Sequence, residues 1–533
     1  GAPLFTGATP IATLVQRVRE PLPELRYRGF VPAELQAVIR RALAESPEER
    51  FTRGADFAAA LAGARHALSD TFTPPATPAA SAEDSIAVLP FTNMSGDPES
   101  EYFSDGVTEE IINALTRLPG LRVAARTSSF AFKGQSADIK EVGRRLGVAT
   151  VLEGSVRQAG DRLRVTAQLI KAVDGYHLWS ERWDREVDDV FEVQAEIAAA
   201  IADRLQVTLA APAPARPPTT NVEAYRLYLK GRHLWNHRDE DSLLKAVDYF
   251  QSAIERDPEF AHAYSGLADT YLLLGSYRII DRGESHQKAK SAAKQACELD
   301  DTLAEAHTSM GQVLRRERDW EGEERAYRRA IELNPNYATA HQWYSTLLAA
   351  QGRMDEAVRE VKQAEMLDPL SHAILVTSAI VHDLARDVDC ALHKIERALE
   401  LEPDFASAVA YSGWIYAERG MFEEAFRANE LMAKIWGADA GGVTAHRANI
   451  HALMGEQEKG RALLEEAIAQ GADPGYVGYV WTSLGESDRA FEWLNRAIDE
   501  DSWFIFHLKV HPALDPLRSD PRFDQLLQRL GLA

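Results

Sequence analysis

The sequence predicts a multidomain protein in which a small α/β domain is followed by a long all-α superhelix, with a short helical segment in front of both. The chain has 533 residues, which is too long for a single hydrophobic core. From residue 304 to residue 403 the sequence repeats every 34 residues without an insertion. Between residues 85 and 210 this period is replaced by strand-like runs and three predicted helices. The change of period separates the two main domains.

The 34-residue repeat is defined by residues that recur in register. The positions shared by all three copies include an alanine (Ala330, Ala364 and Ala398) and a proline (Pro335, Pro369 and Pro403). Small side chains let two antiparallel helices cross closely, and proline ends the second helix. The pattern resembles the tetratricopeptide repeat, which implies stacked helical hairpins. Weaker copies extend the predicted array to about eight repeats over residues 221–502, followed by a capping segment at 503–533.

Charge and hydropathy narrow the classes of partner and the location. The net charge is −22, and most of the acidic excess lies in the repeat region, which disfavours nucleic acid or an anionic membrane as the main partner. No apolar run is long enough to span a membrane, and the N-terminus lacks a signal sequence. We therefore expect a soluble, cytoplasmic chain. Cys297 and Cys390 are expected to pack in repeat helices in a reducing compartment.

Residues 1–66 contain amphipathic helices, and residues 67–84 form a linker rich in Pro, Ala and Thr. The opening Gly-Ala-Pro-Leu-Phe and Arg50 of the PEERF motif resemble the last helices of a bacterial serine/threonine protein kinase, although Leu4 replaces the usual Phe. This resemblance implies a remnant of the kinase C-lobe. The alternative interpretation follows directly, namely that the chain is the C-terminal part of a kinase whose catalytic lobe lies upstream of residue 1.

The motifs of kinase catalysis are missing from the sequence. There is no Gly-rich phosphate loop, no strand lysine of the VAIK type and no DFG magnesium motif. The tripeptide His237-Arg238-Asp239 lacks the required Asn five residues after its Asp, where Leu244 stands. We therefore expect this chain to have no catalytic residues, no cofactor and no enzymatic activity.

Residues 85–210 carry the motifs VLPFTNMSGDPESEYFSDGVTEEI, RTSSFAFKG and GYHLWSERWDRE. These resemble the TolB amino-terminal-like domain of bacterial signalling proteins. The resemblance implies an α/β domain without catalytic activity, placed ahead of tetratricopeptide repeats and behind kinase, cyclase or winged-helix output domains. A second linker is expected at 211–220.

Several polar and aromatic residues of this domain have structural interpretations. Asp105 is predicted to cap a helix, and Glu109 and Glu110 to favour its positive end, so no metal site is predicted. Trp179 and Trp183 are four residues apart on one strand and should pack on the same side, which leaves a partner-binding patch there as an alternative.

The predicted function is a non-catalytic protein–protein interaction scaffold, the docking or sensory half of a bacterial signalling protein. The first helices of stacked repeats line a concave groove in which a peptide can lie. Groove positions of the repeats give Tyr228, Arg232, Trp235, Asp269, Glu305, Gln312, Arg315, Arg316, Gln342, Asp383, Trp414 and Glu418. A transcription regulator is disfavoured because no basic helix-turn-helix is present.

Arg315 and Arg316 carry the most specific hypothesis about the groove. As adjacent cations in an acidic array they are predicted to anchor an acidic or phosphorylated peptide, so that replacing both with Glu abolishes capture without affecting the fold. The alternative is that they pair locally with Glu317 or Asp319, or remain solvated.

Overall fold

The computed structural model describes residues 84–95, 100–118, 120–135, 138–205, 219–277 and 279–533, together with Val38 and Arg41. Contacts divide the chain into two units, residues 1–79 and 80–533. All of the predicted kinase remnant except Val38 and Arg41, and most of both predicted linkers, lie outside the described residues. The fold described below belongs to the second unit.

The α/β domain contains a mixed sheet with the strand order β3-β1-β4-β5-β6, with β2 paired to β4. The strands are β1 (Ser85–Val88), β2 (Thr92–Asn93), β3 (Arg122–Val123), β4 (Thr150–Ala159), β5 (Arg162–Lys171) and β6 (His177–Glu186). β1 is parallel to β3 and β4, whereas β4, β5 and β6 are antiparallel. A turn at Gly160 joins β4 to β5, and its φ of +61° is a conformation that favours glycine.

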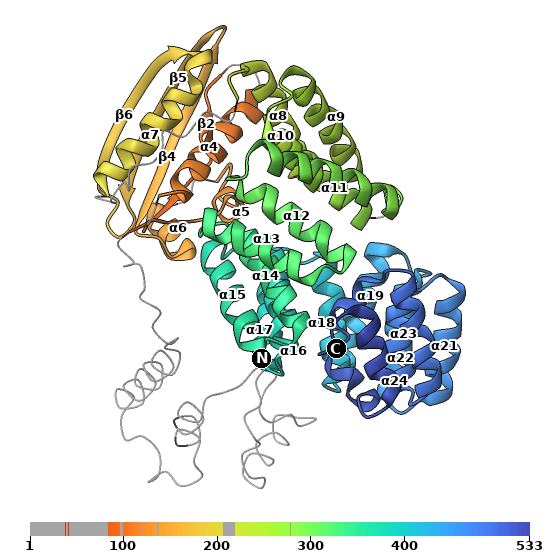
Figure 1. The fold of residues 1–533 in the computed structure, drawn as a ribbon. Coiled ribbons are helices and arrows are strands. Elements are labelled where there is room, and N and C mark those ends of the chain that lie inside the picture. The colour runs from red at the N-terminus through yellow and green to blue at the C-terminus, as the bar shows by residue number, and fades with distance from the viewer. Residues whose placement is uncertain are drawn as a thin grey trace. The chain divides into compact units, whose positions relative to one another are not determined.

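Helices cover both faces of this sheet. They are α4 (Glu101–Thr116), α5 (Arg126–Phe130), α6 (Ile139–Leu146) and α7 (Val190–Arg204). Alternate residues of β1 separate the two faces: Ile86 packs with α4 and α7, whereas Ala87 packs with α6. Trp179 and Trp183 lie on one side of β6 with ring centroids 5.7 Å apart, as predicted, and Trp183 is buried. Figure 1 shows α7 lying along the sheet.

The rest of the second unit is helical, and its described residues form eight antiparallel helix pairs (Figure 1). The pairs are α8 (Val222–Trp235) with α9 (Glu240–Arg256), α10 (Ala261–Ser276) with α11 (Arg282–Leu299), α12 (Ala304–Glu317) with α13 (Trp320–Leu333), α14 (Ala338–Gln351) with α15 (Met354–Leu367), α16 (His372–Leu384) with α17 (Val388–Leu401), α18 (Ala406–Glu418) with α19 (Phe422–Trp436), α20 (Gly441–Leu453) with α21 (Gln457–Ala469), and α22 (Pro474–Ser483) with α23 (Ser487–Asp499).

Close packing within a pair explains the small residues of the repeat. Ala330, Ala364 and Ala398 are fully buried. At Gly311 on α12, an added Cβ would lie 2.3 Å from Cε1 of Tyr327 on α13. A larger residue at this position would push the two helices apart, so the sequence pattern reflects the distance between the helices.

The last segment packs on the final repeat and also returns to the middle of the array. It contains η4 (Trp503–His507), η5 (Pro512–Leu517) and α24 (Pro521–Leu530). The indole Nε1 of Trp320 on α13 donates a 2.7 Å hydrogen bond to the carbonyl of Leu530. Arg386, beyond α16, pairs with Asp515 at 2.8 Å. The predicted cap therefore also joins the end of the array to its third and fifth repeats.

Candidate functional site

Helix α4 of the α/β domain lies against α8, the first repeat helix. An added Cβ at Gly106 would lie 2.5 Å from Cδ1 of Leu229, so the two helices approach very closely. Glu109 on α4 lies between two guanidiniums, with 2.9 Å to Arg232 of α8 and 2.9 Å to Arg126 of α5. Burial alone would raise the pKa of Glu109, but the two arginines hold it below its usual range. The N-terminal part of the predicted groove is thus occupied by a helix of the same chain.

The predicted helix cap at Asp105 is wrong. Helix α4 begins at Glu101, so Asp105 lies in its second turn and cannot cap the first amides. Its carboxylate instead accepts from Nζ of Lys133 at 2.6 Å and lies 3.3 Å from Nδ1 of His233. Glu109 and Glu110 likewise sit mid-helix. Burial together with the neighbouring Glu109 raises the pKa of Glu110 to about 7.

The predicted groove residues of the first three repeats make contacts within the chain. Tyr228 is buried against Phe250 and Phe260, and Trp235 stacks with Arg232. Asp269 accepts a hydrogen bond from Oγ of Ser309, and burial raises its pKa to about 6. Gln312 donates to the hydroxyl of Tyr327, and Glu305 is partly exposed. None of these contacts by itself indicates a ligand.

Arg315 and Arg316 are both engaged by distant parts of the chain. Nε of Arg315 donates to Oε1 of Glu323 at 2.7 Å, and its guanidinium lies over the ring of Phe506 from η4. Glu323 is fully buried and requires this countercharge. Arg316 pairs with Asp501 at 3.1 Å. The geometry does not support an anchor for an acidic peptide, and the partners are neither Glu317 nor Asp319.

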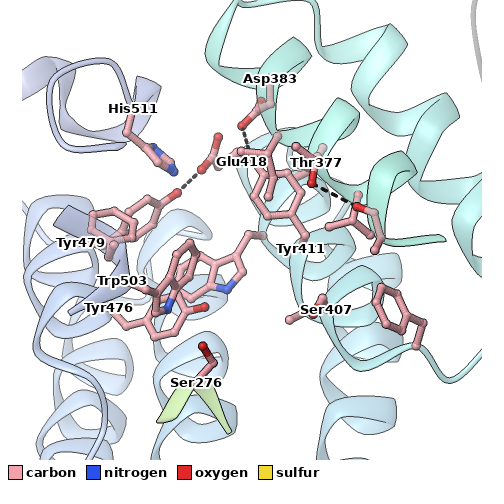
Figure 2. Close-up of a pocket in the computed structure, with 18 of the residues that line it drawn as sticks. Ser276, Thr377, Asp383, Ser407, Tyr411, Glu418, Tyr476, Tyr479, Trp503 and His511 are labelled. Atoms are coloured by element: carbon pink, nitrogen blue, oxygen red, sulfur yellow. Dashed lines mark hydrogen bonds between the residues drawn. The ribbon is translucent and has the colours of Figure 1, made fainter. Parts of the chain in front are cut away.

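The remaining four predicted residues, Gln342, Asp383, Trp414 and Glu418, line one cavity of about 590 Å³. One wall carries Asp383 of α16 with Tyr411 and Glu418 of α18 (Figure 2). The opposite wall carries Tyr476 and Tyr479 of α22, Trp503 of η4, and His511, which precedes η5. The returning C-terminal segment therefore turns part of the concave face into a cavity. Its volume lies within the range that suits a small molecule or a few peptide side chains.

Aromatic rings form much of the cavity lining. The rings of Trp414 and Tyr476 stack with centroids 5.1 Å apart and planes 3° apart. Tyr479 meets Trp414 edge-on at 4.8 Å, and Trp503 meets Tyr476 edge-on at 5.7 Å. Further lining rings are Phe405, Tyr411 and Phe504.

Three lining residues are large, apolar and unusually exposed. Tyr277 is 50% exposed, Trp436 is 45% exposed and Trp503 is 38% exposed. Rings of this size are usually covered, and several exposed rings around one cavity indicate a surface that meets a ligand. We take these three residues as the rim of the cavity.

Two carboxyl groups face this lining. Asp383 accepts a 2.9 Å hydrogen bond from the hydroxyl of Tyr411, and Glu418 accepts one from the hydroxyl of Tyr479 (Figure 2). Burial raises the pKa of Asp383, and burial together with Asp383 raises the pKa of Glu418 to about 7. Neither carboxyl forms an ion pair with a described residue, and the described lining contains no lysine or arginine.

The residues of the opposite wall of the cavity were not among those predicted from the sequence. Tyr476, Tyr479, Trp503 and His511 come from a degenerate repeat and from the segment predicted only as a cap. The density of aromatic residues in YVGYVWTS and SWFIFH was the available signal. Burial lowers the pKa of His511 to about 3, so this lining residue is uncharged at neutral pH.

Three potential metal ligands also come together in the described part of the chain, where none was predicted. Ligand atoms of His382, Asp387 and Cys390 lie within 4.8 Å of one another. Burial raises the pKa of the Cys390 thiol and lowers that of His382, so both are neutral near pH 7. Cys297 and Cys390 are free and only partly buried.

Sequence models of two known protein families match parts of this chain. The model of the HilA/YgeH-like transcriptional regulator second domain matches residues 81–200, and a tetratricopeptide repeat model matches residues 308–370. The second match coincides with part of the 34-residue period and with helices α12–α15. The chain therefore contains tetratricopeptide repeats. The first model covers the segment for which the sequence suggested a TolB-like domain.

Three curated relatives show different kinds of likeness. The protein named "Putative adenylate cyclase 3" of Rhizobium meliloti is 46% identical over 198 residues, covering 37% of this chain and 33% of the relative. Transcriptional regulator HilA of Salmonella typhimurium is 22% identical over 315 residues, covering 58% of this chain and 55% of the relative. Serine/threonine-protein kinase PknB of Mycolicibacterium smegmatis is 42% identical over 62 residues, or 11% of this chain and 10% of the kinase. The chain thus spans at most about half the length of these relatives.

Solved structures also match parts of this chain. PilF of Pseudomonas aeruginosa shares 19% identity, covers 38% of this chain and 91% of its own, and has a TM-score of 0.31. YrrB, described as a TPR protein with an unusual peptide-binding site, shares 22% identity, covers 35% of this chain and 90% of its own, and has a TM-score of 0.25.

Within the described residues, no helix combines the length and the hydropathy that a membrane span requires.

Proposed function

We propose that this chain is a non-catalytic docking module of a bacterial signalling protein and that it binds a peptide segment in the cavity of its repeat groove. The cavity between α14, α16, α18 and the returning C-terminal segment carries the proposal. It combines a volume of about 590 Å³ with stacked rings inside and exposed rings at its rim. Aromatic anchors of this kind dominate the energetics of peptide and protein recognition.

The rest of the chain supports this assignment. Tetratricopeptide repeats generally mediate protein–protein interaction, and the N-terminal part of the groove already holds a helix, α4, against α8. The relatives named for a cyclase, a transcriptional regulator and a kinase agree with a module that is attached to different signalling outputs.

The alternative proposal is that this chain is the C-terminal part of a serine/threonine kinase whose catalytic lobe lies upstream of residue 1. In either case we expect the purified 533-residue chain to show no ATP turnover, measured as phosphate release.

The peptide-binding role can be tested by selection from a random peptide library displayed on phage, with the full chain as bait. Ser407 is exposed and lines the cavity, so Ser407→Trp should block it. Ser291→Trp places the same side chain on an exposed site of α11 that does not line the cavity, and it serves as the matched control.

Peptides selected on the wild-type chain should lose at least tenfold in affinity for Ser407→Trp and keep it for Ser291→Trp, measured by fluorescence anisotropy. Equal affinity for all three chains would place the binding surface elsewhere. Failure to select any peptide that binds the full chain would also count against the proposal.

A further inference from the structure

The charge of the cavity is unbalanced in a way that indicates its ligand. Asp383 and Glu418 face the lining, and their hydrogen bonds come from two tyrosine hydroxyls. The nearby arginines are engaged with other carboxylates: Arg386 lies 2.8 Å from Asp515, and Arg419 lies 3.9 Å from Asp389. Asp383 is buried and Glu418 is partly buried, and neither has a cationic partner among the described residues, an arrangement that a bound cation would stabilise.

The aromatic lining also favours a cation as the ligand, through a different interaction. Stacked rings present the negative faces of their π systems, and cations bind to such faces. In this cavity Trp414, Tyr476 and Trp503 lie close to one another, and the Glu418 carboxyl is held by Tyr479, which packs on Trp414. A single bound group can thus meet rings and a carboxylate together.

From this geometry we infer that the cavity binds the guanidinium of an arginine side chain in the partner peptide. The inference rests on the proposed function and specifies the ligand of the same site. A guanidinium is planar, stacks on aromatic rings and donates in parallel to carboxylates. A lysine ammonium makes neither the stacked contact nor the forked pair of hydrogen bonds. The net charge of −22 also attracts a basic partner over longer range.

The test uses the peptides selected on the wild-type chain. Each arginine is replaced in turn by citrulline, which keeps the shape without the charge, and by lysine, which keeps the charge without the planar fork. One arginine in each peptide should be essential, with citrulline weakening binding at least tenfold and lysine weakening it by a smaller factor. Binding is measured by fluorescence anisotropy at physiological salt.

The protein side of the test removes the carboxylates while keeping the hydrogen-bond acceptors. The double variant Asp383→Asn with Glu418→Gln should reduce the preference for arginine over citrulline to near one. Glu423→Gln, which removes one carboxylate at an exposed position of α19 outside the cavity, should leave this preference unchanged. Measuring both peptides on every variant separates lost preference from a general loss of binding.

The two proposals fail in different ways. If Ser407→Trp blocks the peptides but citrulline binds as well as arginine, the ligand assignment is wrong and the peptide-binding role stands. If the selected peptides contain no arginine, the assignment is also wrong. If Ser407→Trp has no effect, both proposals are overturned.

Discussion

Replacing Glu109 with Gln should loosen the α/β domain from the first repeat. The carboxylate on α4 neutralises Arg126 of α5 and Arg232 of α8, each 2.9 Å away. The Glu109 side chain is 9% exposed, and the two arginine side chains are 20% and 19% exposed. Glutamine keeps the size of the side chain but removes the carboxylate with which both guanidiniums pair.

The size of the effect follows from this burial. Removing one partner of a buried ion pair costs about 3–5 kcal/mol, and the partial exposure of the arginines favours the lower end. A loss of about 3 kcal/mol raises the population of a locally opened state by roughly a hundredfold. Hydrogen exchange measured by mass spectrometry should therefore be roughly a hundredfold faster in α4, with no change in α23 at the other end of the array.

The control is Glu141→Gln on α6. Glu141 forms an exposed pair with Arg144, so its replacement should leave exchange in α4 at the wild-type rate. If Glu109→Gln also left exchange in α4 unchanged, then the ion pairs would not hold α4 against α8 and our account of the filled N-terminal groove would be wrong.

Three further predictions concern the repeats and the cavity. Ala364→Trp should lower the melting temperature, because overpacking this fully buried position costs about 1–3 kcal/mol. Met366→Trp, at a half-exposed neighbouring position, should not lower it, and equal melting curves for the two variants would refute the packing argument. Arg315→Glu should lower the melting temperature, because it would place a second carboxylate next to the buried Glu323, whereas Arg316→Glu should have a small effect. A wild-type melting temperature for Arg315→Glu would contradict the ion pair with Glu323. Affinity for an arginine peptide should rise about tenfold from pH 6 to pH 8, because the pKa of Glu418 is about 7 and the ligand needs its carboxylate. The raised pKa of Asp383 acts in the same direction, whereas His511, with a pKa of about 3, stays neutral, and burial raises the pKa of Tyr411 and Tyr479 above its usual value, so both hydroxyls stay protonated. The guanidiniums of Arg386 and Arg419 are paired with Asp515 and Asp389, and a flat pH profile would contradict the role of the Glu418 carboxylate.

The features that the sequence predicted well depend on local spacing. The 34-residue period predicted helices α12–α17. The prediction was possible because the two helices that cross closely belong to one hairpin, so the small residues at the crossing lie near one another in the sequence. The turn at Gly160 was likewise predictable, since a positive φ in a tight hairpin favours glycine. Asp105 was misplaced because helix α4 begins five residues earlier than its polar pattern suggested, so a side chain expected to cap the helix lies in its second turn.

The features that the sequence did not predict depend on contacts between distant residues. Trp320 and Leu530 are 210 positions apart, and no repeat pattern relates them. Arg315 was placed in the groove by its repeat position, but the same pattern gave no sign that Glu323 and Phe506 would cover it. For the same reason, the four predicted residues that line the cavity all belong to one of its walls, and no residue of the opposite wall was predicted.

A crystal structure of the full chain bound to a selected peptide would test the central claim most directly. Our account predicts an arginine side chain inside the cavity, with its guanidinium between the aromatic rings and the carboxylate of Glu418. A peptide bound on any other surface, with the cavity between α16, α18 and α22 unchanged, would contradict it.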